Sequence, residues 1–136
     1  MTRGHPDYNP AVFPHMPTLG PGQTLWYRAA ESAIAGGGTL RQIDYTTTAG
    51  YELYVTGAII SSNSSYIHAV ELVYGDAYAL SFVGKVYYDT NFVMPITGYN
   101  RLVVPADQSV GMLCYNDDNQ NHGFSVCLIG FLQEKE

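Results

Sequence analysis

Hydrophobic and polar residues alternate along most of the chain after residue 39, in short segments separated by turn-forming residues. In an extended strand, alternate side chains point to the same face. The alternation in 51–59 puts one set on a single face, namely Tyr51, Leu53, Val55, Gly57 and Ile59. In 66–74 the equivalent set is Tyr66, His68, Val70, Leu72 and Tyr74. This period of two predicts strands with one face toward a core.

Two of these strands begin and end in the same way. Thr48–Ile60 opens with a small polar turn, continues as a long alternating strand and ends in the polar segment 61–65. Val104–Tyr115 repeats the plan and ends in 116–119. A chain that repeatedly enters strands through short turns is typical of antiparallel sandwiches and barrels.

The turn signals divide the chain after residue 39 into eight expected strands. These cover residues 39–46, 51–61, 66–74, 78–88, 91–96, 100–104, 109–115 and 123–132. No helical period is interleaved with them. The pattern therefore predicts an all-β fold, an antiparallel jelly-roll sandwich of about eight strands.

The first 22 residues form a segment of different character. Five of the seven prolines lie in it, and at that spacing neither a helix nor a central strand can form. We expect an extended Pro-rich N-terminal arm. It carries apolar residues suited to docking on another chain, namely Tyr8, Val12, Phe13, Met16 and Leu19. The alternative is a leader without a fixed conformation.

Residues 23–38 are expected to connect the arm to the jelly-roll domain, which we place at 39–136. Thr24–Arg28 could begin a strand with Trp26 as its core anchor, whereas 29–35 has a helix-forming composition. Gly36–Gly38 ends this segment and could act as a hinge.

The composition points to surfaces that contact other molecules. Charged residues make up 13% of the chain, compared with about 25% in an ordinary soluble domain. Much of the polar surface must then come from uncharged residues and from the 12 tyrosines, whose rings suit contact surfaces. A sheet protein rich in strand-forming residues would be the simpler explanation.

The charges and the apolar runs of the chain argue against nucleic-acid partners, membrane insertion and secretion. The net charge is −6 and the six basic residues are scattered, so we expect no nucleic-acid partner. No apolar run approaches about 18 residues, so we expect no membrane insertion. The N-terminus has no apolar signal core, so secretion by the ordinary route is not indicated.

Candidate chemistry is sparse. His68 and Glu71 are the best metal candidates, but a step of three residues places them on opposite faces of a strand. The segment 116–123 is rich in oxygen ligands but lacks the spacing of a calcium loop. Neither a nucleophile elbow nor a phosphate-binding loop is present. We therefore expect no catalytic residues, no metal and no cofactor.

The two cysteines, Cys114 and Cys127, flank what the sequence indicates as the last hairpin, with strands at 111–115 and 124–131. This would bring them near each other across the strand pair. Direct cross-strand disulfides are geometrically awkward, and both residues lie in apolar sequence. We expect reduced thiols that fill space in the core.

Three segments together resemble small jelly-roll virion proteins of tailed bacteriophages. They are TTTAGYELYVTGAIISSNSS, RLVVPADQSVGMLCYN and GFSVCLIGFLQ, and the resemblance covers residues 39–132. The final strand also resembles that of cellular jelly rolls of the tumour-necrosis-factor type. The phage resemblance implies a homotrimeric decoration or cement protein that is assembled in the host cytoplasm and stabilises the outside of a capsid. Its partners would be the major capsid protein or neighbouring virion proteins.

A different function is compatible with the same fold. A tail or fibre-tip module would bind a host cell-surface glycan through loops 61–65, 75–78 and 116–123. A jelly-roll enzyme is a third possibility. Fold alone does not decide among these functions.

Overall fold

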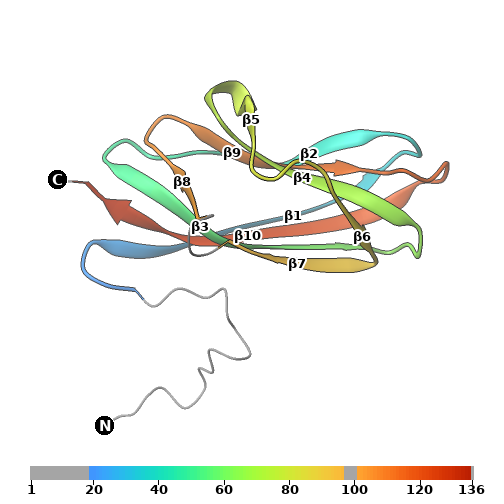
Figure 1. Ribbon diagram of the computed structural model, residues 1–136, viewed down its shortest axis with the longest axis horizontal. Coiled ribbons are helices and arrows are strands. Elements are labelled where there is room, and N and C mark those ends of the chain that lie inside the picture. The colour runs from blue at the N-terminus through green and yellow to red at the C-terminus, as the bar shows by residue number, and fades with distance from the viewer. Residues whose placement is uncertain (1–18, 97–100, 136) are drawn as a thin grey trace, which may run out of the picture.

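The computed structural model describes residues 19–96 and 101–135, which form two facing antiparallel sheets (Figure 1). One sheet, hereafter the first sheet, has the order β1-β10-β3-β7, with β8 also paired to β3. Its strands are β1 (Gln23–Ile34), β3 (Tyr51–Ser62), β7 (Asn91–Pro95), β8 (Leu102–Val104) and β10 (His122–Glu134). No helix of the described residues is long and apolar enough to cross a membrane.

The second sheet has the order β2-β9-β4-β5, with β6 also paired to β4. Its strands are β2 (Thr39–Thr46), β4 (Ile67–Gly75), β5 (Leu80–Ser81), β6 (Val86–Asp89) and β9 (Ser109–Tyr115). The short 3-10 helix η1 (Asp76–Tyr78) lies between β4 and β5.

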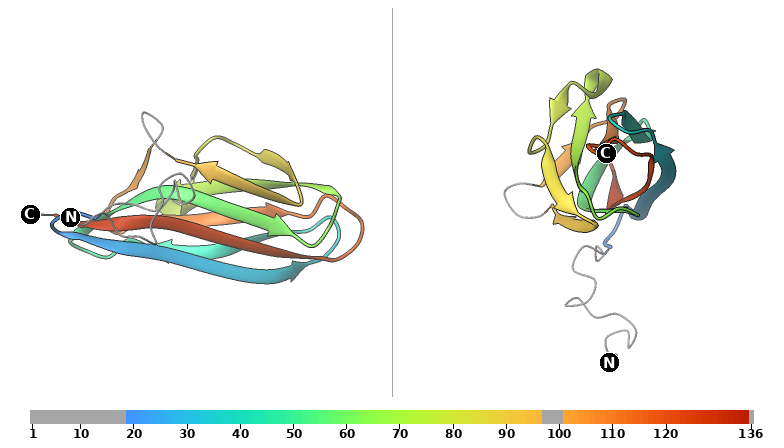
Figure 2. Two further views of the ribbon diagram at one scale, coloured as in Figure 1. Left: turned by 90° about the horizontal axis from the view of Figure 1, so that it is seen from below. Right: turned by 90° about the vertical axis from the view of Figure 1, so that its right-hand side faces the viewer.

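The connectivity is that of a jelly roll. Successive strands such as β1 and β2, β3 and β4, or β9 and β10 belong to opposite sheets. Strands β5 and β6 pair with successive parts of β4, and β7 and β8 pair with successive parts of β3. The ten described strands therefore occupy eight positions, and the end view in Figure 2 shows the two sheets wrapped around a common interior. The predicted all-β jelly-roll sandwich is confirmed.

Strand β1 corrects the expectation for residues 23–38. Residues 23–34 form one strand that pairs with β10 along its whole length, so they belong to the sandwich and do not merely connect to it. Trp26 is buried in the core, as its anchor role required. The helix-forming composition of 29–35 is overridden because pairing with β10 satisfies the backbone there. Gly37 closes the following turn by donating its N–H to the carbonyls of Asn116 and Asp118.

The core lies between the sheets and draws large side chains from both. The largest fully buried ones include Phe124, Leu53, Ile60, Leu72, Met112 and Leu128. Burying one such side chain stabilises the folded state by about 1.5–3 kcal/mol. The sandwich is held together chiefly by this contact between facing sheets.

A β-bulge at Thr56 changes which residues of β3 face this core. Gly57 pairs with Ile129 and Val55 pairs with Gly130, so Thr56 is an extra residue on β3. Before it, Leu53 and Val55 are buried; after it, Ala58 and Ile60 are buried. The prediction that Ile59 shares one face with Leu53 and Val55 is therefore wrong. In 66–74, by contrast, His68, Val70 and Leu72 are all buried, as the alternation predicted.

The cysteines are also arranged differently from the sequence prediction. Strands β9 and β10 lie in opposite sheets, so residues 111–131 do not form a hairpin. Cys114 is fully buried and burial raises its pKa to about 11, whereas Cys127 is only partly buried. Both are free thiols, as expected, but only Cys114 is a core residue.

Substitution of Gly130 tests the close packing of the backbone at the bulge. A Cβ on Gly130 would clash with the carbonyl oxygen of Tyr54, which belongs to the backbone of the β3–β10 pair. We expect Gly130→Ala to lower the free energy of unfolding by about 1–3 kcal/mol in urea denaturation. Gly20→Ala is the matched control, because its added Cβ meets only the Gln23 side chain at ordinary contact distance. Equal stability of the two variants would contradict the bulge geometry.

Candidate interaction surfaces

The structure locates only one of the five predicted partner-binding residues. Tyr8, Val12, Phe13 and Met16 lie outside the described residues. Leu19 is 43% exposed and lies just before β1. The segment after it is tied to the sandwich, because Gly22 accepts a hydrogen bond from the N–H of Glu134.

The outer surface of the first sheet is an apolar face that sequence reasoning missed. Register places Ala29, Cys127, Ile59 and Val93 in one row across four strands. Ile59 and Val93 are 39% and 45% exposed. We call this row the apolar strip.

Neighbouring rows on the same surface are also apolar. Tyr27 is aligned with Ile129 on β10, and Leu25 with Phe131. Phe131 stacks on Tyr54 of β3, with ring centroids 4.9 Å apart. Tyr27 is 61% exposed. Its ring makes none of the aromatic stacking contacts found among the described residues. The face is thus broad, and charged groups reach it at Tyr54, whose ring lies 5.6 Å from the guanidinium carbon of Arg101.

A shallow hollow interrupts the apolar face across β1, β10 and β3. Its volume is about 420 Å³, and small side chains line it, among them Ala29, Ser61, Ser125 and Cys127. Glu31 and Ile59 border it. Such a hollow can accept one large side chain of a partner.

The surface of the second sheet also exposes apolar side chains, such as Tyr87 and Ile67, but several of its aromatic rings are paired with charges. The hydroxyl of Tyr115 donates to Glu71 over 2.6 Å, and Lys85 lies over the Tyr115 ring at 4.1 Å. Arg41 lies over Tyr78, whose hydroxyl donates to Asp44. These groups already satisfy one another, so this surface is less suited to an apolar contact.

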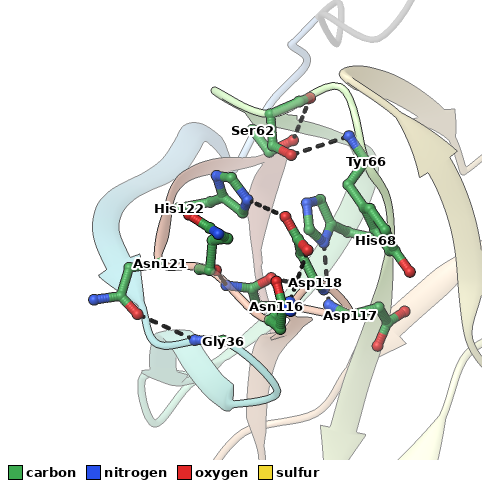
Figure 3. A network of polar contacts seen from close by, with 12 residues as sticks. Gly36, Ser62, Tyr66, His68, Asn116, Asp117, Asp118, Asn121 and His122 are labelled. Atoms are coloured by element: carbon green, nitrogen blue, oxygen red, sulfur yellow. Dashed lines mark hydrogen bonds and ion pairs between the residues drawn. The ribbon is translucent and has the colours of Figure 1, made fainter.

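One end of the sandwich carries a polar network of loop residues (Figure 3). Asn116 is buried and donates its side-chain amide to the carbonyls of Ile34 and Gln120, both at 2.8 Å. Gly36 donates its N–H to Asn121, which draws in the β1–β2 turn. The Asn-rich segment 116–121 therefore acts as a brace between turns.

Histidines complete this network. His68 is fully buried, and its Nδ1 accepts the backbone N–H of Asp117 at 3.1 Å. Its Nε2 has no hydrogen-bond partner among the described residues. His122 pairs with Asp118 at 2.7 Å, which together with the N–H of Asn119 holds the pKa of that carboxyl below its usual value.

The structure shows where the metal candidates of the sequence lie and what they bond to. His68 points into the core while Glu71 bonds to Tyr115 on the outer face, so the predicted opposite orientation is confirmed. Loop oxygens of 116–121 bond to nearby backbone N–H groups. In the ranges 19–96 and 101–135, no group of three or more His, Cys, Asp or Glu side chains is placed to hold a metal ion.

The loops proposed for glycan binding are only partly brought together. Asn63 and Gly123 exchange two hydrogen bonds, so 61–65 and 116–123 meet at one end of the sandwich. Helix η1 follows the opposite end of β4 and contacts Asp44 through Tyr78. The three loops therefore do not form one site.

The sequence did contain a signal for the apolar face. Gly57 and Gly130 interrupt apolar strand segments, and an isolated glycine in a strand often marks a bulge. Applied to β3, that rule would have shifted the inward set after residue 56 and moved Ile59 to the outside.

The chain was compared with known proteins by sequence and by structure. Neither a protein-family description nor a curated protein matches the sequence. Among solved structures, the chain is similar to a protein of the cyanophage Pam1 capsid, with 14% identity, a TM-score of 0.48 and coverage of 93% of this chain and 99% of that one.

Two further structures show similarity at the same level. PirA has 10% identity and a TM-score of 0.47, with 74% of this chain and 92% of that chain covered. The virus-like particle of the extra small virus of the prawn Macrobrachium rosenbergii has 9% identity and a TM-score of 0.44, with 100% and 96% covered. Similarity at this level does not identify a function.

His68 should make the stability of the domain depend on pH. Burial, and next the neighbouring His122, lower the pKa of His68, while Asp117 and Asp118 oppose this shift. Since the unfolded chain binds the proton more readily, the free energy of unfolding should fall as pH falls below about 6.5. The slope from this residue cannot exceed about 1.4 kcal/mol per pH unit. Urea denaturation at pH 7.5 and 5.5 measures it.

Two variants isolate the contribution of His68. His68→Gln should flatten the dependence, because the titrating group is removed. His122→Gln should retain most of it, because His68 stays buried and still accepts from Asp117. An unchanged slope in His68→Gln would show that other groups cause the dependence.

Proposed function

We propose that this protein is a structural virion protein that decorates or cements the outside of a capsid. The observation that carries the proposal is the apolar face on the first sheet of a jelly-roll sandwich. Exposed apolar surfaces of this kind mark contact sites in soluble proteins. The low charge content of the chain, 13%, supports the same conclusion because interface cores are depleted of charge.

The arm and the face would serve different contacts. Residues 1–22, with Tyr8, Val12, Phe13, Met16 and Leu19, would bind the major capsid protein or a neighbouring virion protein. A stiff Pro-rich segment loses little entropy on docking, which favours such a role. Binding to the assembled shell alone would stabilise that shell by linkage. The location would be the capsid surface of a phage, after assembly in the host cytoplasm.

Binding, not catalysis, is the activity we propose. Support comes from the polar network, whose histidines and carboxylates are bonded to loop backbone and to each other. A protein that links shell subunits must bind several of them at once. Closed symmetric oligomers provide several equivalent binding sites, so we propose a homotrimer.

Glycan recognition by a tail or fibre-tip module is the second candidate. It is favoured by the junction of loops 61–65 and 116–123 and by the nearby Tyr66, which is 49% exposed. An aromatic ring beside polar loops can stack on a sugar. A glycan array with the purified full chain distinguishes the two functions, since a cement protein should bind no glycan.

Attachment to particles should require the arm. We expect deletion of residues 1–18 to leave a folded domain, because Gly20 and Gly22 retain their hydrogen bonds to Gln23 and Glu134. Co-sedimentation with purified virions of the encoding virus should weaken at least about tenfold, equivalent to about 1.4 kcal/mol. The combined substitution Phe13→Ser and Met16→Ser should act in the same direction without shortening the chain. Wild-type attachment of both proteins would exclude the arm as the binding segment.

The oligomer should be metal-independent. We expect light scattering at micromolar concentration to give a mass that is a multiple of three copies of the 14.9 kDa chain. Addition of EDTA should change neither this mass nor the thermal unfolding midpoint. A monomeric mass, or loss of structure with chelator, would contradict the prediction.

A further inference from the structure

Strand β1 is an edge strand with an unprotected side. Within the described residues it pairs with β10 alone, over 12 residues and without a register shift. The edge strand of the second sheet, β2, is shorter and has a bulge between Arg41 and Ile43. Bulges are one device that keeps edges from pairing, and β1 has none in its pairing with β10; its charged residues are Arg28 and Glu31.

Hydrogen bonds near β1 show which of its backbone groups face outward. The carbonyl of Gly22 accepts from the N–H of Glu134 at the end of β10, so the backbone groups of Gly22 point toward β10. The carbonyl of Tyr27 accepts from the guanidinium of its neighbour Arg28, so it points to the free edge. Because alternate residues of an antiparallel strand point the same way, the N–H and C=O groups of Leu25, Ala29, Glu31 and Ala33 also face that edge.

We propose that β1 pairs antiparallel with β1 of a second copy of this chain, about a two-fold axis at Ala29. The second copy brings the same row of edge-facing donors and acceptors, so the contact satisfies both edges at once, provided that Arg28 releases the Tyr27 carbonyl to the N–H of Glu31 of the second copy. It would join two first sheets into one continuous sheet. The inference deepens the proposed virion role, on which its biological meaning rests, by naming one contact between copies.

The charges of β1 are compatible with this register and disfavour two others. With the axis at Ala29, Glu31 lies opposite Tyr27 of the second copy, and Arg28 lies opposite Ala30. An axis at Glu31 or at Arg28 would place like charges directly opposite one another, which destabilises a strand pair. The small side chain of Ala29 also allows close approach at the axis.

Side chains on the apolar face fit the same arrangement. The apolar strip of one copy, from Val93 to Ala29, would continue into that of the second copy. Tyr27 of the second copy would lie beside Glu31, which borders the hollow of about 420 Å³. The exposed ring and the hollow are therefore placed to fill each other. A two-fold contact is compatible with trimers, because it can link copies that belong to different trimers.

Cysteine cross-linking tests the register in a Cys127→Ser background. In the proposed pair, the two Ala29 residues lie about 5.5 Å apart. The two Ala33 residues would lie about 27 Å apart, at about 3.4 Å per residue along both strands. A short bis-maleimide should convert most Ala29→Cys protein to a covalent dimer on a denaturing gel, and little of the Ala33→Cys protein. Equal cross-linking of both, or none at Ala29, overturns the proposal.

A proline variant tests the hydrogen bonds themselves. The N–H of Ala29 faces the free edge, so Ala29→Pro removes no bond to β10, and proline is tolerated at such positions. We expect it to keep a cooperative thermal transition and to halve the mass by light scattering. Ala30→Pro is the contrast, because it should lower the unfolding midpoint by breaking the ladder. An unchanged mass in folded Ala29→Pro overturns the β1 contact.

Purified virions separate this inference from the proposed function. Protein that attaches to particles but shows no cross-link at Ala29 retains the virion role and loses the β1 contact. Protein that cross-links at Ala29 but attaches to no particle retains the contact and loses the virion role.

Discussion

The pairing of β10 on both of its sides is the interaction on which the rest of the structure depends. This strand pairs with all of β1 and with nearly all of β3, so the N- and C-terminal parts of the described chain are joined at the centre of the first sheet. Its inward side chains, including Phe124 and Leu128, fill the core against the second sheet. Because these contacts join residues far apart in sequence, the first sheet forms only when β1, β3 and β10 have come together.

The bulge opposite Gly130 allows this long pairing and has a consequence for the surface. Without an extra residue on β3, Ala58 and Ile60 would turn away from the core and Ile59 would enter it. The bulge restores a well-packed interior at β3 and leaves Ile59 on the outer face. One local irregularity thereby connects core packing to the formation of the apolar strip.

Polar residues serve structure at one end of the sandwich and leave the apolar face free for contacts. Asn116, Asn121 and His68 bond to the backbone at two connections, the β1–β2 turn and the loop 116–121, so these amide and imidazole groups have a structural role. Buried polar groups of this kind are favourable only when they are bonded. Among the described residues, Nε2 of His68 is one of four buried polar side-chain atoms without a hydrogen-bond partner, and burial lowers the pKa of this imidazole.

The sequence by itself determined the fold class, the approximate limits of most strands and the opposite orientation of His68 and Glu71. These features follow from the period of two and from turn residues, which act over a few positions. Tertiary structure alone decided the place of 23–34, since its alanine-rich composition favours a helix until β10 is available as a partner. It also decided the separation of Cys114 from Cys127, because two strands adjacent in sequence can belong to opposite sheets. The apolar face depends on register across four strands, and register is set by long-range pairing that no local pattern contains.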